Sequence, residues 1–385
     1  MSDYKDAIPG YKETIERIHN LEENNPVPYN YWAETAKVIN EYHPKRLQLR
    51  VSEIIAETAT SKTLRLVSTD GYLPPFQAGQ YINLFVDIEG ITTSRAFAIS
   101  SSPNTLNHYD LTIRKIKDGF ISQYLVNDVQ VGQEFISTGP MGNFYYNPIY
   151  QSKNVVFLAG GSGVAPAMSM IRELVENGDD KTITLIYGSM NLDDIIFKNE
   201  LDQLANEHSS VRVEYVVTNP PENYQGYRGF ISADIIQDIL EAPEDNTFFV
   251  CGPQIMYGFA EAELRKLNIK RRNIKFEANG PPSDPSQEPG WPEDVNKTKK
   301  VKVTVTGGKS FETEAGEPLL NALERNGIVM ESACRSGECS LCRCKVVKGE
   351  VFEPKQAHVR KSDKQYGYVH SCVTFAVGDI DIEIQ

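Results

Sequence analysis

The stretch Ser332-Ala333-Cys334-Arg335-Ser336-Gly337-Glu338-Cys339-Ser340-Leu341-Cys342 places three cysteines close together in the spacing C-x4-C-x2-C. A fourth cysteine, Cys372, follows after a long gap. Gly337 lies inside the loop, where the lack of a Cβ lets the chain bend sharply and lets backbone N–H groups approach a sulfur atom. The spacing therefore predicts a tight loop that presents three thiolates to one centre, with the fourth supplied by a distant segment.

Cysteines at this spacing are typical of a plant-type [2Fe–2S] cluster. We therefore predict that Cys334, Cys339, Cys342 and Cys372 are the cluster ligands. The alternatives are disulfides or a zinc site. Zinc ligands usually come as two short C-x2-C pairs or with nearby histidines, and His370 is the only histidine close to Cys372.

Composition limits the class of protein. The chain has 385 residues, enough for two or three domains with their own cores. Its formal net charge of −13 argues against non-specific binding to nucleic acids. Five of the six cysteines lie in or beside the cluster motif, and Cys344 is predicted to be a small buried residue on the following strand. Such cysteine usage suits a reducing compartment, and no signal peptide or membrane-spanning run is recognisable. We therefore expect a cytoplasmic protein with no transmembrane segment.

Changes in hydrophobic period divide the chain. Alternating residues from Leu47 onward predict short antiparallel strands. Continuous apolar runs from Val155 onward alternate with helical patterns and predict a parallel sheet. We therefore predict a multidomain α/β and β fold. Its parts are a helical extension (1–46), an antiparallel β-barrel (47–150), a parallel α/β domain (151–278), an extended, semi-stiff proline-rich linker (279–298) and a C-terminal β-grasp domain of ferredoxin type (299–385).

The N-terminal extension shows helical spacing on both sides of a break at residues 22–28. An apolar stripe on a helix usually packs against a core, so we expect this arm to pack on the main body; the alternative is a docking arm for a partner protein. No cofactor motif falls within residues 1–45, so their deletion is expected to leave the chemistry of the main body intact. The spaced residues are Tyr11, Ile15 and Ile18 before the break, and Trp32, Thr35, Val38, Ile39 and Tyr42 after it.

Several motifs follow one another between the arm and the linker. They are Arg95-Ala96-Phe97-Ala98-Ile99-Ser100-Ser101, Gly119–Leu125, Gly139–Phe144, Leu158–Pro166, Tyr187–Ser189 and Cys251–Met256. Their order closely resembles the ferredoxin–NADP reductase superfamily over residues 47–277. With the C-terminal cluster domain, the layout looks like the phthalate dioxygenase reductase type: a flavin domain, then a nicotinamide domain, then a ferredoxin domain.

The resemblance implies a flavin bound by the barrel. Arg95 offers a fixed fork to phosphate oxygens, Phe97 offers a planar surface for the isoalloxazine ring, and the turn 119–122 opens a helix whose N–H groups suit a second phosphate. Taken alone, Arg95 in a surface ion pair and Phe97 in a core are the alternatives. Two phosphate sites favour FAD, although a reductase of this layout can use FMN. The candidate residues are Arg95, Phe97, Ala98, Ile99, Ser100, Thr112, Arg114, Gly119, Phe120, Ile121 and Ser122.

One position departs from the family pattern. The arginine–aromatic motif of the family usually ends in serine, whose hydroxyl approaches the flavin N5, but Ala98 stands there in this sequence. The backbone N–H remains able to bond N5, whereas the hydroxyl is absent. Ser100, which we expect on the same face of the strand, is the candidate replacement.

A glycine-rich turn, residues 160–163, follows a buried strand and precedes a helix, which is the setting of a dinucleotide-binding loop. The G-x-G-x-x-G pattern is incomplete because Pro166 takes its last place, but the superfamily's own version ends in proline. The resemblance places the nicotinamide at Cys251, for which a buried core position is the alternative, and it lets Phe276 shield the flavin. The candidate residues are Gly160, Gly161, Ser162, Gly163, Gly188, Ser189, Cys251, Gly252, Pro253 and Phe276.

Residues 188–194 bear on the choice between NADH and NADPH, because in the superfamily they face the adenosine ribose. A site that selects the 2′-phosphate normally supplies Arg or Lys. This stretch has no basic residue, Met190 stands where many relatives have arginine, and Asp193–Asp194 would repel a phosphate. Ser189 could instead bond the plain ribose hydroxyls. We therefore expect NADH, unless Arg228 reaches the ribose.

Electron counting suggests how the parts work together. A nicotinamide delivers two electrons as hydride, a cluster accepts one, and a flavin takes two and releases them singly, so the flavin must lie between them. The first hypothesis is a reductase that passes electrons from NADH to a separate redox protein, such as an oxygenase or another metalloenzyme. The alternatives are a permanent electron-transfer subunit of a larger redox complex, including one that runs toward NAD reduction, and a redox-sensing protein with an inactive nicotinamide site.

Overall fold

The computed structural model describes residues 10–24, 31–42, 44–117, 119–178, 180–277, 280–355 and 357–384. Contacts divide the chain into two units, Met1–Lys45 and Arg46–Gln385, and each is described by itself. Among the helices in these ranges, none combines the length and the apolar run needed to cross a membrane.

The N-terminal unit contains two helices, α1 (Tyr11–Asn24) and α2 (Tyr31–Tyr42), on the two sides of the predicted break. Residues 25–30 lie outside the described residues, as does the side chain of Trp32. The packing of this arm on the main body stays a prediction. Apolar side chains exposed on the two helices are Ile18, Leu21, Val38, Ile39 and Tyr42.

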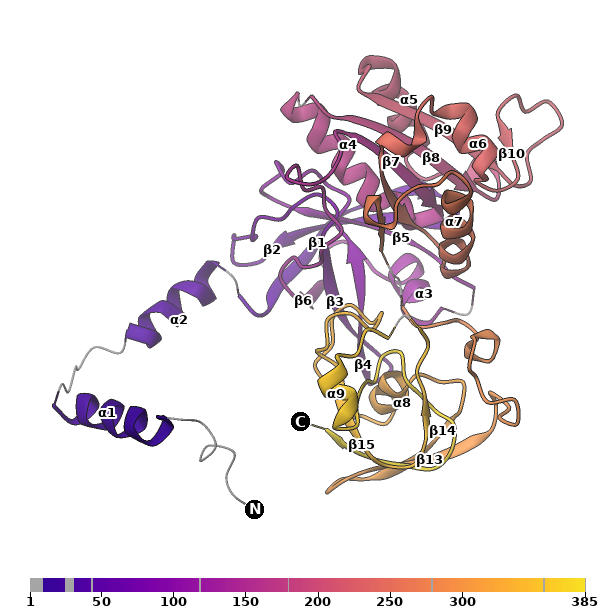
Figure 1. The fold of residues 1–385 in the computed structure, drawn as a ribbon. Helices are drawn as coiled ribbons and strands as arrows, with labels where there is room; N and C mark the ends of the chain where they lie inside the picture. The colour runs from indigo at the N-terminus through magenta and orange to yellow at the C-terminus, as the bar shows by residue number, and fades with distance from the viewer. Residues whose placement is uncertain are drawn as a thin grey trace. The chain divides into compact units, whose positions relative to one another are not determined.

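The main body begins with an antiparallel barrel (Figure 1). Its elements are β1 (Leu47–Thr58), β2 (Ser61–Ser68), β3 (Tyr81–Ile88), β4 (Ile91–Ala98), β5 (Tyr109–Arg114), α3 (Phe120–Asn127) and β6 (Glu134–Ser137). The strands pair in the order β4-β3-β6-β1-β2-β5. An isolated bridge between Ile99 and Leu111 joins the end of β4 to β5 and closes the sheet. The first residues of β1 alternate between buried and exposed, as the period of two predicted.

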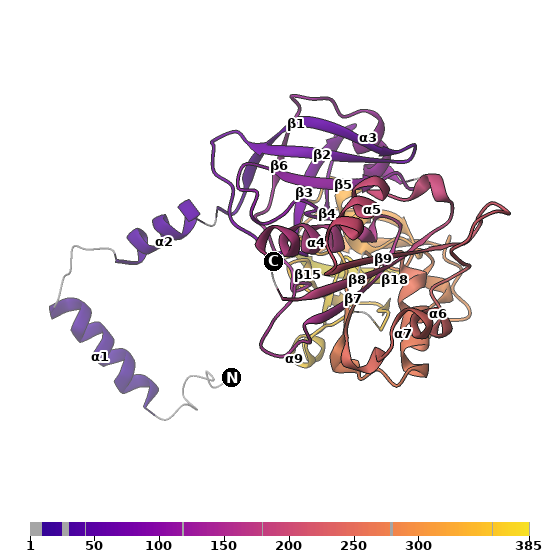
Figure 2. The ribbon, with the colours of Figure 1, turned by 90° about the horizontal axis from the view of Figure 1, so that it is seen from above.

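A parallel sheet with helices on both faces follows the barrel. Its elements are β7 (Asn154–Gly160), α4 (Ala165–Asn177), β8 (Thr182–Ser189), α5 (Lys198–Glu207), β9 (Val211–Val217), β10 (Tyr227–Arg228), α6 (Ala233–Ile239), β11 (Thr247–Cys251), α7 (Gln254–Lys266) and β12 (Ile274–Phe276). The strand order is β10-β9-β8-β7-β11-β12, and Figure 2 shows α4 and α5 on one face with α6 and α7 on the other. The order changes direction between β7 and β11. The loops after these two strands therefore meet at the point where such sheets bind ligands.

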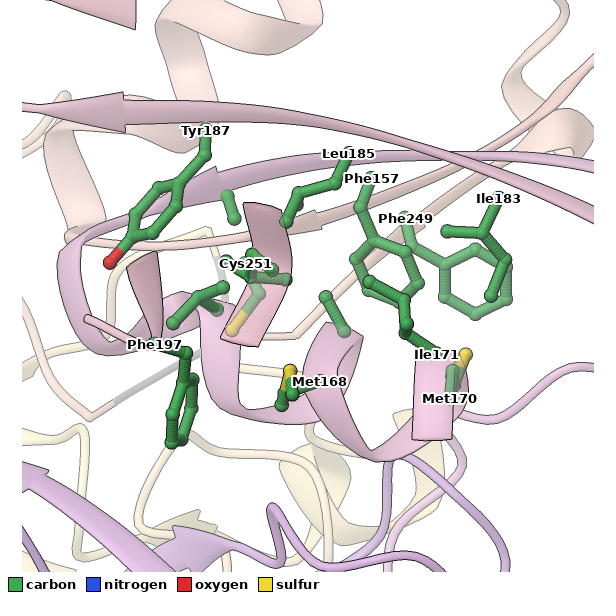
Figure 3. Close-up of a cluster of buried hydrophobic side chains, with 14 of the residues drawn as sticks. Phe157, Met168, Met170, Ile171, Ile183, Leu185, Tyr187, Phe197, Phe249 and Cys251 are labelled. Carbon is green, nitrogen blue, oxygen red and sulfur yellow. The ribbon is translucent and has the colours of Figure 1, made fainter. Parts of the chain in front are cut away.

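Strand β7 is apolar from Val155 to Ala159 because its two faces enter two cores. Phe157 packs with residues of α4 and α5, whereas Leu158 packs with residues of α6 and α7. Figure 3 shows the first core, in which Met168 and Ile171 of α4 approach Phe157 and Phe249 of the sheet. The rings of Phe157 and Phe249 stack with their centroids 5.2 Å apart. Burial on both faces explains the continuous apolar run that predicted a parallel sheet.

The C-terminal part is a small mixed sheet that holds a helix, as predicted. Its elements are β13 (Lys300–Val305), β14 (Ser310–Glu314), α8 (Leu319–Arg325), β15 (Arg343–Lys348), α9 (Lys361–Gln365), β17 (Tyr368–His370) and β19 (Ile380–Ile384), with β16 (Val351–Phe352) and β18 (Phe375–Ala376) as a separate pair. The main sheet has the order β14-β13-β19-β15-β17, and β13 and β19 run parallel at its centre.

The proline-rich segment is less free than a plain spacer. It contains one short turn of 3-10 helix, Pro285–Gln287. The indole of Trp291 donates to the carbonyl of Val295 at 2.8 Å and meets the ring of Phe352 edge-on at 5.2 Å. The second half of the linker is therefore anchored to the C-terminal domain.

Candidate functional site

The cysteine loop arranges backbone N–H groups around one sulfur atom. Three of its residues have left-handed backbone conformations, among them Gly337 with a φ of 85°. Three N–H groups consequently point at the Sγ of Cys334 at 3.3–3.4 Å. Such donors stabilise a thiolate, which is the form that ligates iron. The N–H groups belong to Ser336, Glu338 and Cys339.

The structure brings the four predicted ligands together. The thiols of Cys339 and Cys372 hydrogen-bond to Cys334 and lower the pKa of Cys334 well below its ordinary value. The thiol of Cys372 also bonds to Cys342. Four thiols joined in this way, with none of the cysteines in a disulfide, form the donor set that a [2Fe–2S] cluster requires. Cys344 lies apart on β15, fully buried as predicted, where burial raises its pKa to about 12.

The segment that carries Cys372 is tied to the loop by hydrogen bonds. The buried imidazole of His370 bonds through Nδ1 to the carbonyl of Gly337 at 2.7 Å, and the hydroxyl of Ser371 donates to the carbonyl of Cys342 at 2.8 Å. Because Nδ1 meets a carbonyl oxygen, it is the protonated nitrogen, and His370 braces the loop. No group of three or more His, Cys, Asp or Glu in the described parts of the chain is arranged to hold a metal ion. The fit of a cluster therefore rests on the donor set and the N–H groups of the loop.

Arg95 extends from β4 and finds neutral hydrogen-bond partners. Its Nη1 donates to the carbonyl of Ser94 at 2.7 Å and to the hydroxyl of Thr93 at 3.3 Å. Burial lowers the pKa of Arg95 to about 9, and the nearby Arg335 adds to this shift while Glu324 opposes it. A buried cation hydrogen-bonded to neutral oxygens is stabilised by an incoming anion. Arg95 is therefore suited to the flavin phosphate that the motif predicts.

The rest of this motif points partly into the barrel. Phe97 is half-buried against the barrel core, and Ile99 is fully buried, so only the backbone of Ile99 can meet a ligand. The hydroxyl of Ser100 is also fully buried, where it bonds the carbonyl of Asp110 and the hydroxyl of Thr112. Ser100 therefore does not replace the hydroxyl that is missing at Ala98, because a partner across the closed barrel holds it.

The glycine turn before α3 lies where the sequence placed it. α3 begins at Phe120, with Gly119 as its extended N-cap residue. Phe120 is exposed and Ile121 is buried, while the hydroxyl of Ser122 accepts the N–H of Ile116 at 3.1 Å. The first turn of α3 thus retains the N–H groups that a phosphate would use.

The glycine-rich loop after β7 packs directly on the end of β11. A Cβ added to Gly163 would lie 2.1 Å from the carbonyl oxygen of Cys251, so only glycine permits this approach. A Cβ on Gly161 would lie 2.9 Å from Nη1 of Arg114, which arrives from the barrel. The predicted nicotinamide loop, Gly160–Gly163, is therefore a cradle bounded by Gly252 and Arg114. Ser162 is its only residue with a side chain.

The loop after β8 differs from the prediction in two respects. Asp194 does not remain free to repel a phosphate: it forms an ion pair with Arg114 and accepts hydrogen bonds from Thr58 and Thr60 at 3.1 and 2.6 Å. Ser189 is buried, and its hydroxyl donates to the carbonyl of Asn191 at 2.9 Å, so it is not free for a ribose.

Met190 and Arg228 both agree with a site for a ribose that carries no 2′-phosphate. Met190 is 47% exposed beside Gly188. Arg228 donates to the carbonyls of Pro221, Glu222 and Tyr224 at 2.8–3.3 Å. The guanidinium that we considered for the 2′-phosphate is thus held by its own loop.

Two further candidates lie near the end of the parallel sheet. Cys251 is 3% exposed and belongs to the core, in agreement with the alternative considered for it. The ring of Phe276 meets Tyr257 edge-on at 5.9 Å and lies under the guanidinium of Arg271. These contacts hold Phe276 within its own domain, and its shielding of the flavin stays a prediction.

Two residues that the motifs did not indicate mark the junction of the three domains. Tyr81 begins β3 of the barrel, and burial raises its pKa, with Cys334 and Cys339 of the cysteine loop next in effect. Glu277 follows β12, and burial, then Glu338 of the cysteine loop, raise its pKa to about 8. Both residues are therefore close enough to the cysteine loop to sense its charge, although they are far from it in the sequence. Glu277 directly follows the candidate Phe276, whereas no motif borders Tyr81 in the sequence.

Three family models match the barrel, the parallel domain and the C-terminal domain in turn. The model of the oxidoreductase FAD-binding domain matches residues 46–146, that of the oxidoreductase NAD-binding domain matches residues 157–262, and that of the 2Fe-2S iron-sulfur cluster binding domain matches residues 303–377. Fold and site together define an NAD(P)H-dependent oxidoreductase that transfers electrons through a flavin and an iron–sulfur cluster.

Individual relatives extend over nearly the whole chain. The NADH oxidoreductase HCR of Escherichia coli is 31% identical over 337 residues, which cover 86% of this chain and 96% of that protein. A glycine betaine monooxygenase reductase subunit of Pseudomonas aeruginosa is 26% identical over 374 residues, 93% of this chain and 98% of that protein. The structure of phthalate dioxygenase reductase shares the fold, with a TM-score of 0.66 and 20% identity over 88% of this chain and 98% of that one. The chain belongs to the ferredoxin–NADP reductase superfamily, in the group that carries flavin, nicotinamide and ferredoxin domains in that order.

Proposed function

We propose that this protein takes hydride from NADH and delivers single electrons to a separate oxygenase. The observation that carries the proposal is that the barrel contacts both other domains. Asn83 of the barrel donates to the carbonyl of Ser332, two residues before Cys334, at 2.9 Å. Lys275 of the parallel sheet donates to the carbonyls of Asn143 and Tyr145 of the barrel at 3.2 and 3.0 Å. Hydride and single-electron chemistry are supplied by the bound nicotinamide, flavin and cluster. The protein's task is to hold these groups close together and in order.

Each domain supplies binding groups of a different kind. The barrel, for which we propose the limits 47–150, offers Arg95 to a flavin phosphate and the backbone of Ala98 to the ring. The parallel domain, 151–278, offers the bare backbone of Gly160–Gly163 to a pyrophosphate. The linker, 279–298, joins it to the cluster domain, 299–385, which offers four thiolates. The other candidate residues named above are proposed in these roles, except Ser100, Ser189 and Cys251, whose side chains are held elsewhere.

NADH is the proposed donor because the loop after β8 presents no cation to a 2′-phosphate. Met190 is exposed there, and Arg228 is held by carbonyls of its own loop. Arg114 is the remaining cation at the cradle, but its contact with Gly161 places it near the position of the pyrophosphate. We propose FAD as the flavin, since Arg95 and the first turn of α3 offer two phosphate sites. The mass of the flavin released by acid checks this assignment.

An oxygenase is the proposed acceptor because two relatives of this layout are named for one: a glycine betaine monooxygenase reductase subunit and phthalate dioxygenase reductase. A cytoplasmic location agrees with six cysteines that form no disulfide. A permanent subunit of a larger redox complex remains the second candidate. Size-exclusion chromatography of the protein from its native source distinguishes them: a reductase that elutes alone supports a separate acceptor.

The decisive experiment is an anaerobic titration of the purified protein with NADH. We expect bleaching of the flavin absorbance, followed by the electron paramagnetic resonance signal of a reduced [2Fe–2S] cluster. If NADH bleaches no flavin although flavin and cluster are bound, the protein is not an NADH-dependent reductase. If flavin is reduced but no cluster signal appears, the proposed order of electron flow is wrong.

A further inference from the structure

The edge strand of the barrel is covered by the cluster domain. Apart from the single bridge that Ile99, just after β4, makes to β5, β4 is the last strand of its sheet, and an open edge of this kind needs a cover or a partner. The side chain of Asn83, on the neighbouring β3, donates both to the carbonyl of Ser332 and to the hydroxyl of Ser94, each at 2.9 Å. Asn83 is fully buried. The cysteine loop is thus hydrogen-bonded to the barrel two residues before its first ligand, Cys334.

A charged pair strengthens the same contact. Thr93 donates through its hydroxyl to Glu324 of α8 at 2.8 Å, and the guanidinium of Arg335 donates to the hydroxyl of Thr93 at 3.2 Å. Arg335 also forms an ion pair with Glu324, and their side chains are only 4% and 5% exposed. One threonine hydroxyl of the barrel therefore joins the helix and the cysteine loop of the cluster domain.

This network has little tolerance for displacement. Within the described residues, Nε of Arg335 and Oδ1 of Asn83 are buried and have no protein partner. A buried polar network that is already short of partners is destabilised further if a shift breaks another bond. The Arg335–Glu324 pair lies within the cluster domain, so a shift against β4 would keep the pair but remove the hydroxyl of Thr93 that bonds both of its side chains. These groups consequently favour a single register of the cysteine loop against β4.

We propose that Glu324 and Arg335 are positioning residues that keep the cluster domain docked on the flavin barrel throughout turnover. The docking network consists of Asn83, Thr93, Ser94, Glu324, Ser332 and Arg335. Its role rests on the proposed function, because only a chain that passes electrons from flavin to cluster needs a fixed separation between them. A docked cluster must then deliver electrons through the edge that remains open, where Leu341 is 45% exposed between two ligands.

The network also adjoins the proposed phosphate-binding residue. The hydroxyl of Thr93 that accepts from Arg335 accepts from Arg95 as well. A change at Thr93 would therefore disturb flavin binding and docking together. Glu324 acts on Arg95 only through its charge and has no hydrogen bond to it among the described contacts, so it is a better position for a test than Thr93.

The test compares Glu324→Gln with Glu317→Gln in the full chain loaded with flavin and cluster. Both variants replace a carboxylate that pairs with an arginine of the cluster domain, but the side chains of the Arg325–Glu317 pair are 46% and 24% exposed. For Glu324→Gln we expect hydrogen exchange in residues 91–98 to accelerate about tenfold or more, since an opened interface frees the edge strand. We expect electron transfer from flavin to cluster, followed by stopped-flow absorbance, to slow by a similar factor. Flavin reduction by NADH should change less than about twofold, and Glu317→Gln should alter none of the three rates.

If Glu324→Gln keeps the exchange and cluster-reduction rates of the parent, the proposal is overturned. It is also overturned if flavin reduction falls in parallel, because that result places Glu324 in the flavin site. If this variant does not fold, Asn83→Ala is judged by the same three rates, with an expected change of about threefold. A parent protein whose flavin NADH does not reduce would instead contradict the proposed function, so the two failures are distinguishable.

Discussion

The flavin barrel meets its two neighbours through interfaces of different character. Toward the parallel domain, the ion pair of Arg114 with Asp194 has side chains that are 24% and 13% exposed, and Asn104 reaches Glu176 at an exposed position. Toward the cluster domain, the hydroxyl of Thr93 bonds both members of a buried ion pair, Glu324 and Arg335, which lies within that domain. Partly hydrated charges separate and reform at small free-energy cost, whereas buried hydrogen bonds to charged groups typically contribute about 1.5–3 kcal/mol each.

This difference matches what each interface has to do. A nicotinamide must enter and leave at every turnover, and the partly hydrated ion pair beside the cradle of Gly160–Gly163 can rearrange while buried contacts, such as the hydroxyl of Ser169 on the carbonyl of Ser101, hold the two domains together. The cluster stays in place and needs only a constant distance from the flavin. Charged side chains therefore lie at both interfaces of the barrel. The partly hydrated Arg114–Asp194 pair is the easier one to rearrange, and the buried groups around Thr93 are the harder ones.

The largest expected effect is on electron transfer from the cluster to a protein acceptor. Reduction of the flavin by NADH should remain. Cys339→Ser replaces the partly exposed ligand, and hydroxyl oxygen is a poor substitute for thiolate on iron. We expect loss of the cluster's visible absorbance and a fall of about a hundredfold in reduction of a one-electron protein acceptor. Reduction of a small dye by NADH should remain within about twofold, because the flavin is reduced in another domain. Complete loss of dye reduction with flavin still bound would show that the domains do not act as separate modules.

The next effect concerns only the interface between the barrel and the parallel domain. Asp194→Ala removes the acceptor of Arg114, Thr58 and Thr60, so the barrel and the parallel domain lose an anchor beside the nicotinamide cradle. We expect flavin reduction by NADH to slow by about tenfold, in line with the sensitivity of reactions to misplacement. Electron transfer from flavin to cluster should be unchanged. Asp193→Ala, at the neighbouring exposed position, is the matched control, and equal effects of both variants would refute the role of the anchor.

Features that depend on local spacing were predictable from the sequence. The cysteine loop, the glycine turn after β7 and the alternation along β1 each follow from neighbours within a few residues, so the domain order could be inferred, and the cluster ligands stay a prediction that this spacing supports. The four thiols indeed lie together in the structure, with N–H groups directed at Cys334. Their loop needs only its own backbone to form.

Features that depend on contacts between domains were not predictable. Thr93 contacts Arg335, which lies 242 residues away in the sequence, and Arg114 contacts Asp194, which lies 80 residues away. Hydrophobic periodicity reports only on nearby residues and cannot identify such partners. Ser100 shows the same limit within one domain. Its place after β4 was clear, but Thr112 on another strand of the closed barrel decides that its hydroxyl turns inward.

A further substitution tests the preference of the parallel domain for NADH over NADPH. Met190→Arg places a guanidinium in the loop after β8, where the 2′-phosphate of NADPH is expected. We expect the ratio of kcat/KM for NADPH to that for NADH to rise about tenfold, since one added charge-assisted hydrogen bond is worth roughly 1.5–3 kcal/mol before screening. Met190→Gln, which adds polarity without charge, should leave the ratio unchanged. A parent protein that prefers NADPH would overturn the assignment of the donor.

The smallest effect is expected at Glu277, where the two interfaces meet. Its carboxyl faces Glu338 and Cys334, with Lys275 as the opposing cation, and its pKa is raised to about 8 from an ordinary value of 4.5. Between these values the folded chain keeps a proton that the unfolded chain has lost, so this group lowers the free energy of unfolding as pH rises through that window. Glu277→Gln removes the titration. Its melting temperature should match the parent's at pH 5 and exceed it by roughly 3 °C at pH 9. Glu293→Gln, exposed in the linker, should show no such trend, and a pH-independent difference for Glu277→Gln would mean that the carboxyl is hydrated rather than buried at the junction.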